Sequence, residues 1–142
     1  MQLLSPQKTF IDEALFGLRL LLGFVFLYHG VPKLLDTTAT IGAFESLGLP
    51  GLLGLVVGVL EVVGAVLLIL GVATPIASLV LAAIIVSAIG LVHLPEGSIA
   101  AGLERDLLIL GASIVVFTAG PGRYALNTHS RSETTVSEKA EG

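Results

Sequence analysis

The chain contains no cysteine among its 142 residues. This absence excludes disulfide bonds, thiolate metal sites, iron–sulfur clusters and a dithiol relay within the chain. Charged residues are also scarce, at 13%, whereas a typical soluble domain has about 25%. The net charge of −4 provides no basic surface for nucleic acid. Nucleotide-binding and nucleophile-elbow motifs are missing as well, which argues against a soluble kinase or hydrolase.

Apolar residues, by contrast, make up 54% of the chain, and the mean hydropathy is +0.98. A small domain has a large surface for its volume, and in a soluble protein polar side chains cover that surface. This chain has too few polar residues to do so. We therefore predict a single domain that has lipid around much of its surface.

Four apolar stretches predict four transmembrane helices, at residues 14–35, 51–71, 75–94 and 104–120. A spanning helix needs about 20 residues, and the fourth stretch is short unless its charged start lies at the membrane rim. The short turn at residues 71–75 makes the second and third helices antiparallel neighbours. The predicted fold class is therefore all-α, an integral membrane four-helix bundle with short loops that occupies residues 14–126.

The segments outside these helices are more polar. Residues 1–13 precede the first helix, and residues 127–142 form a polar tail without periodicity, which predicts disorder. Between the first two helices, Ile41, Phe44 and Leu47 recur at helical spacing. This pattern fits either a short interfacial helix or an ordinary loop with some apolar residues.

The distribution of basic residues predicts the orientation of the chain. If both termini are cytoplasmic, that side carries more basic residues, namely Lys8, Arg123, Arg131 and Lys139. The outer side then carries Lys33 and Arg105. Lysine and arginine concentrate on the cytoplasmic side of membrane proteins, so we predict that both termini are cytoplasmic.

Charged and polar residues inside the first helix call for an explanation, because charge is costly in a bilayer. Arg19, His29 and Lys33 share one helical face, since Lys33 projects about 40° from each of the other two. That face is expected to point into the bundle or a cavity. The alternative is that Arg19 and Lys33 reach the two interfaces and that His29 is a satisfied polar residue.

Glu61 is the most informative residue, because it lies at the middle of the second helix, roughly 15 Å from the start of that helix. At that depth the carboxyl must be protonated or paired with a cation, for which Arg19, His29 and Lys33 are available. Glycines project to the same side of the helix and predict close packing against another helix of this bundle or of a partner. They are Gly51, Gly54, Gly58, Gly64 and Gly71. Two functions remain open for Glu61, a clasp that fixes helix register and a proton-handling carboxylate beside a ligand.

Other polar residues carry weaker signals. His29 and His93 fall at similar depth and suit a haem only weakly, and no third residue at helical spacing supports a zinc site. The sequence Glu104-Arg105-Asp106 is interpreted as a charged anchor at the start of the fourth helix. Tyr28 is interpreted either as an interface anchor or as a residue that stacks on a quinone.

The sequence also resembles a known family. Residues 19–34, RLLLGFVFLYHGVPKL, are similar to the first-helix signature of the DoxX family, and residues 44–50 resemble the segment before its second helix. Glu61-Val-Val-Gly64 and the closing GPGRYALN of residues 120–127 continue the resemblance. Many members have aspartate where this chain has Asn127.

The resemblance implies a four-helix membrane protein of a prokaryotic plasma membrane. Named members of the family are similar to a subunit of thiosulfate:quinone oxidoreductase, and others associate with enzymes that defend against oxidative stress. Carried over by position, His29, Lys33 and Glu61 are the matching polar residues, with Arg19 next. We expect His29, Lys33 and Glu61 as catalytic residues, and Arg19, Tyr28 and Glu61 as ligand-binding residues. We expect quinone as the ligand and no metal.

Three hypotheses follow. In the first, the chain is a redox subunit in which Lys33 or His29 stabilises a reduced quinone, Glu61 exchanges the proton, and a partner protein supplies electrons. In the second, the chain is a non-enzymatic scaffold that recruits a soluble enzyme. In the third, it is a small proton-coupled carrier, which would require a homo-oligomer because four helices make a thin wall.

Overall fold

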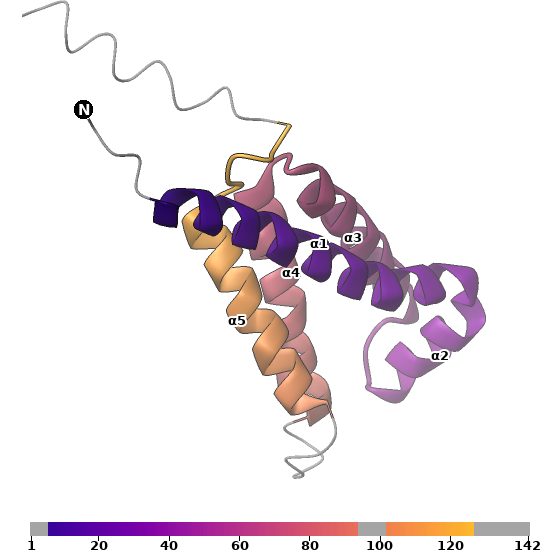
Figure 1. Cartoon of the computed structure of the whole chain (residues 1–142). Coiled ribbons are helices and arrows are strands. Elements are labelled where there is room, and N and C mark those ends of the chain that lie inside the picture. The colour runs from indigo at the N-terminus through magenta and orange to yellow at the C-terminus, as the bar shows by residue number, and fades with distance from the viewer. Residues whose placement is uncertain (1–5, 94–101, 127–142) are drawn as a thin grey trace, which may run out of the picture.

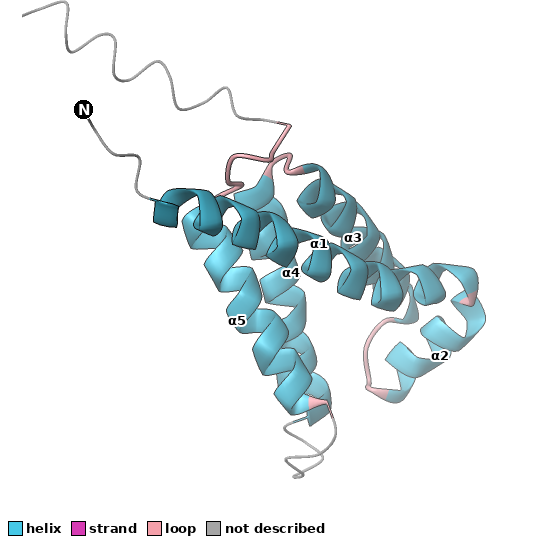
Figure 2. Ribbon diagram, in the orientation of Figure 1, coloured by secondary structure: helices cyan, strands magenta, loops and turns pink. Residues whose placement is uncertain are grey.

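The computed structural model describes residues 6–93 and 102–126, and every regular element within these two ranges is helical (Figure 2). The helices in chain order are α1 (Pro6–Leu35), α2 (Thr37–Ser46), α3 (Gly51–Leu70), α4 (Thr74–Ala88), the π-helical turn η1 (Ile89–His93) and α5 (Leu103–Ala119) (Figure 1). The predicted all-α fold is thus confirmed. The expectations for Asn127 and for the tail at residues 127–142 lie outside the described residues.

Two of the described helices are long and apolar enough to cross a membrane. They are Gly51–Leu70, with a mean hydropathy of 2.8, and Thr74–Val92, with a mean hydropathy of 2.5. The turn between them is made by Gly71, whose φ of 72° ends α3 in the left-handed conformation, and Val72 donates its N–H to the carbonyl of Leu67. A left-handed glycine cap with such a bond is a common helix ending, so this turn sends α4 back along α3 as predicted.

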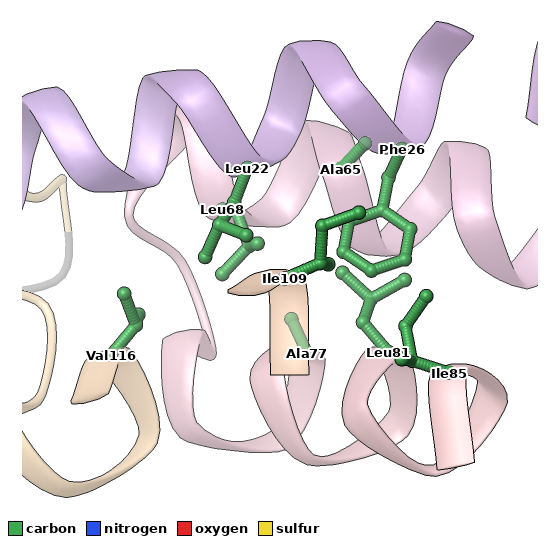
Figure 3. Packing of buried hydrophobic residues seen from close by; sticks show 9 residues of the cluster. All are labelled: Leu22, Phe26, Ala65, Leu68, Ala77, Leu81, Ile85, Ile109 and Val116. Carbon is green, nitrogen blue, oxygen red and sulfur yellow. The ribbon is translucent and has the colours of Figure 1, made fainter. Parts of the chain in front are cut away.

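The helices form two pairs, α1 with α3 and α4 with α5, which pack against each other through α3 and α4 (Figure 1). The start of α1, the end of α3 and the end of α5 lie at one end of the bundle, and the pairs diverge toward the other end. A cluster of buried apolar side chains from all four helices joins the pairs (Figure 3). Its members are Leu22, Phe26, Ala65, Leu68, Ala77, Leu81, Ile85, Ile109 and Val116.

Glycines bring α1 and α3 into close approach. A Cβ added at Gly30 would lie 2.9 Å from the Cβ of Glu61, and one added at Gly58 would lie 3.1 Å from the Cβ of Lys33. Small residues allow helix backbones to approach in this way. Close packing of Glu61 against another helix is thus found at Gly58, and that helix is α1 of the same chain. The other predicted glycines face elsewhere, because Gly51 and Gly54 meet α2 and Gly64 meets Leu81 of α4.

The segment between α1 and α3 is a helix and not an ordinary loop. Asp36 caps α2 by accepting the N–H of Ala39 at 3.0 Å, as N-cap aspartates commonly do. Thr40 is buried and donates its hydroxyl to the carbonyl of Lys33 at 2.9 Å. Within the described residues α2 packs on α1 and α3 only, and not on α4 or α5. It therefore extends the wall of the α1–α3 pair at the divergent end of the bundle.

Helix bounds differ from expectation at the N-terminal side. α1 begins at Pro6, before the expected start of the span at Ala14, and it continues through Pro32 to Leu35. Proline lacks the N–H that a helix interior requires, so one backbone bond is missing at Pro32, and α1 ends three residues later at Leu35. The carbonyl of Pro32 still accepts the N–H of Asp36 at 3.0 Å.

Candidate functional site

An ion pair joins the last turn of α1 to the middle of α3. The Nζ of Lys33 lies 2.6 Å from Oε1 and 2.5 Å from Oε2 of Glu61. The Glu61 side chain is 5% exposed and the Lys33 side chain 27% exposed. The close approach of Gly30 and Gly58 sets this contact, because it places the two backbones directly beside the pair.

The pair lines a cavity of about 400 Å³ between the diverging helix pairs. Most of its wall is apolar and comes from both sides of the bundle. Phe26, Phe44, Leu47, Leu49, Leu53, Val57, Ile84, Ile85, Ala88, Leu91 and Val92 contribute to it. An apolar cavity with a few convergent polar groups is the usual form of a small-molecule site.

A second ion pair lines the same cavity from α5. The Nε of Arg105 lies 3.0 Å from Oδ1 of Asp106, whose side chain is 5% exposed while that of Arg105 is 55% exposed. The sequence indicated only a charged anchor at this position. The run Glu104-Arg105-Asp106 was the available signal, but it could not show that Asp106 points inward while Glu104 remains exposed.

His29 also lines the cavity, as its position on the face of Lys33 predicted. Its ring meets the edge of Tyr28 at a centroid distance of 5.6 Å. Three of the residues expected at a site, His29, Lys33 and Glu61, therefore come together. They offer donors and an acceptor of hydrogen bonds within an apolar enclosure.

Arg19 does not join this site, contrary to its predicted ligand-binding role. Its side chain is fully buried at the other end of the bundle and donates to backbone carbonyls, those of Leu68 at 2.9 Å, Ile69 at 3.4 Å, Tyr124 at 3.1 Å and Pro121. The last four carbonyls of a helix have no partner within it. At the end of α3, Arg19 bonds the carbonyl of Ile69 and that of Leu68, which also accepts the N–H of Gly71 at 3.2 Å. It also fixes the segment that follows α5.

Tyr28 is not at the cavity wall either. It is 78% exposed, since it neighbours His29 in sequence but projects from a different side of α1. Its expected ligand-binding role therefore has no support from the geometry. The side chain of His93 lies outside the described part of the chain. Within that part, no group of three or more histidine and carboxylate side chains suits a metal ion.

Comparison with known proteins identifies the family of the chain. The profile of the DoxX family matches residues 14–94. A protein of Bacillus subtilis (strain 168) named "Putative oxidoreductase CatD" is 34% identical over 110 residues, which cover 78% of this chain and 81% of that protein. No solved structure matches the chain. The chain belongs to the DoxX family.

Proposed function

We propose that the chain is the membrane subunit of a quinone-linked redox complex, and that its cavity holds the quinone head. The Lys33–Glu61 pair carries this proposal, because it places a cation and a carboxyl on the wall of an otherwise apolar cavity beside a helix apolar enough to span a membrane. The name of the Bacillus subtilis relative, an oxidoreductase, supports a redox role.

The residues suit this ligand chemically. A quinone takes up two electrons and two protons to become a quinol, and its oxygens accept hydrogen bonds before reduction and donate them afterwards. Lys33 can donate to such an oxygen, and Glu61 can accept or supply a proton, which are the roles expected of a positioned acid–base pair. The electrons come from a partner protein that carries its own redox centre.

The predicted membrane orientation implies a depth in the bilayer for the cavity. With both termini on the cytoplasmic side of a prokaryotic plasma membrane, the divergent end of the bundle lies toward the outer surface. The cavity then lies in the outer half of the bilayer and reaches inward to its middle. An apolar molecule dissolved in the lipid would reach it without crossing the whole membrane.

The test is mass spectrometry of the organic extract of the protein after purification in mild detergent. We expect near-stoichiometric quinone in the wild type and in Glu104→Gln, whose exposed carboxyl lies next to the cavity residues but outside the wall. Glu61→Gln, which keeps the shape and removes the charge, should lose most of the quinone and the activity of the partner enzyme.

The competing functions make different predictions. A scaffold would yield an extract with bulk phospholipid alone, and a soluble enzyme would co-purify equally with the wild type and with Glu61→Gln. A proton-coupled carrier would move solute across vesicles in the absence of any redox partner. Either result, without bound quinone, would overturn the proposal.

A further inference from the structure

We propose that the Arg105–Asp106 pair is a second hydrogen-bonding position for the ligand, so that the cavity selects a head with two opposed oxygens, as in a para-quinone, over a head with one. This inference rests on the proposed function and deepens it. It adds α5 to a site for which sequence had indicated residues of α1 and α3 alone.

The first argument is the position of the two ion pairs. Lys33 and Glu61 belong to the α1–α3 pair of helices, whereas Arg105 and Asp106 begin α5, and all four residues line the same cavity. Within the described residues α3 and α5 do not pack against each other. A ligand in the cavity therefore has one polar wall on the α3 side and another on the α5 side, with apolar side chains between them.

The second argument is the similar construction of the two pairs. In each, the carboxylate side chain is 5% exposed, while the cation is more open, at 27% for Lys33 and 55% for Arg105. Both pairs thus present a buried acceptor together with a donor group. Lysine has three N–H donors and arginine has five, so each cation can bond its carboxylate and still reach a ligand oxygen.

The third argument is charge. Each pair is neutral as a unit, so the four side chains together add no net charge to the cavity. A charged ligand head would have to lose water without gaining a countercharge there, and burial of an uncompensated charge is costly. An uncharged head with hydrogen-bonding oxygens has no such cost. A para-quinone has this character before and after it takes up two electrons and two protons.

The experiment compares two ligands that differ in one oxygen. The probes are a para-naphthoquinone with one prenyl tail and the matched mono-ketone with the same tail, each titrated onto the full chain in lipid nanodiscs. We expect the wild type to prefer the quinone by about 10- to 100-fold, the range for one hydrogen bond to a charged group.

The variants locate the source of this preference. In Arg105→Met combined with Asp106→Leu, which removes the pair and keeps the charge balance, the preference should fall close to onefold while the mono-ketone binds as in the wild type. If the double variant does not fold, Arg105→Met alone replaces it and leaves Asp106 in place. This single variant should also lower the preference for the quinone. Glu104→Gln should keep the full preference, because its side chain is exposed and outside the wall.

The outcomes separate the two proposals. If the wild type binds neither probe, the proposed quinone site is wrong, and this inference falls with it. If the wild type binds both probes equally, or if the quinone preference survives the loss of Arg105 and Asp106, the second position is wrong while the quinone site stands on Glu61 alone.

Discussion

Replacement of Arg19 by methionine should destabilise the end of the bundle at which α1 begins and α3 and α5 end. The guanidinium is fully buried and is the donor in four hydrogen bonds to backbone carbonyls. Two acceptors, Leu68 and Ile69, are in the last turn of α3, and the other two, Pro121 and Tyr124, are in the segment after α5. One side chain thus ties three parts of the chain together.

The magnitude follows from what the variant leaves behind. Each buried polar group that loses its partner costs about 1–3 kcal/mol, while removal of a buried guanidinium recovers part of the energy spent on taking that charge out of water. Arg19→Met leaves neutral carbonyls and no unpaired charge, so we expect a net cost of about 1–3 kcal/mol, the range for a buried polar group that loses its partner. This is a large share of a typical stability of about 5–15 kcal/mol.

The assay is reversible unfolding of the protein in mixed micelles, with Arg123→Met as the matched control. Arg123 is exposed in the same segment, and only its backbone N–H is bonded there, to Asp12 at 3.1 Å. The control should unfold within about 0.5 kcal/mol of the wild type, as surface substitutions usually do. If Arg19→Met also unfolds within that margin, the structural role assigned to Arg19 is refuted.

Three further predictions concern the turn and the site. Gly71→Ala should cost about 1–2 kcal/mol in unfolding free energy from its left-handed φ of 72° alone, and an unchanged midpoint would contradict this. Gly30→Ala should weaken quinone binding and lower stability by about 1–3 kcal/mol, because the new Cβ would lie 2.9 Å from that of Glu61. Gly17→Ala on the same helix meets nothing within 4 Å, so equal effects of the two variants would be against the packing argument. Lys33→Met should unfold more easily than Lys33→Met with Glu61→Gln, since the single change leaves a buried carboxylate without its cation. Equal stability of the two variants in the same unfolding assay, or the reverse order, would show that the carboxyl is not charged.

Sequence periodicity predicted which residues share a face of a helix. It did not predict which residues of two neighbouring helices lie at the same height along the bundle. The helical wheel placed Arg19, His29 and Lys33 on one side of α1, and all three were available to Glu61. In the structure Lys33 meets Glu61, whereas Arg19 meets Leu68 near the end of α3. Which cation lies opposite Glu61 depends on the axial register of two antiparallel helices. The glycine contacts set that register, and they form only after the helices pack.

The role of α5 was beyond sequence reasoning for a related reason. Acidic residues near the start of a helix are favoured by the helix dipole, so Asp106 looked like an ordinary anchor. α4 and η1 lead the chain back to the divergent end, where Asp106 lines the same cavity as His29 and Lys33 of α1. No local pattern in residues 104–106 reports a contact made across the bundle.

The structure also bears on whether the Lys33–Glu61 pair exists to hold the helices in register. Close packing at Gly30 and Gly58 already fixes α1 against α3, because a Cβ at either position would clash or press on the facing helix. Buried ion pairs add little net stability, since desolvation offsets their attraction. A clasp at this point would therefore repeat a constraint that the glycines already supply, and it would add the desolvation cost of two charged groups. This argument favours the proposal that the pair acts on a ligand in the cavity it lines.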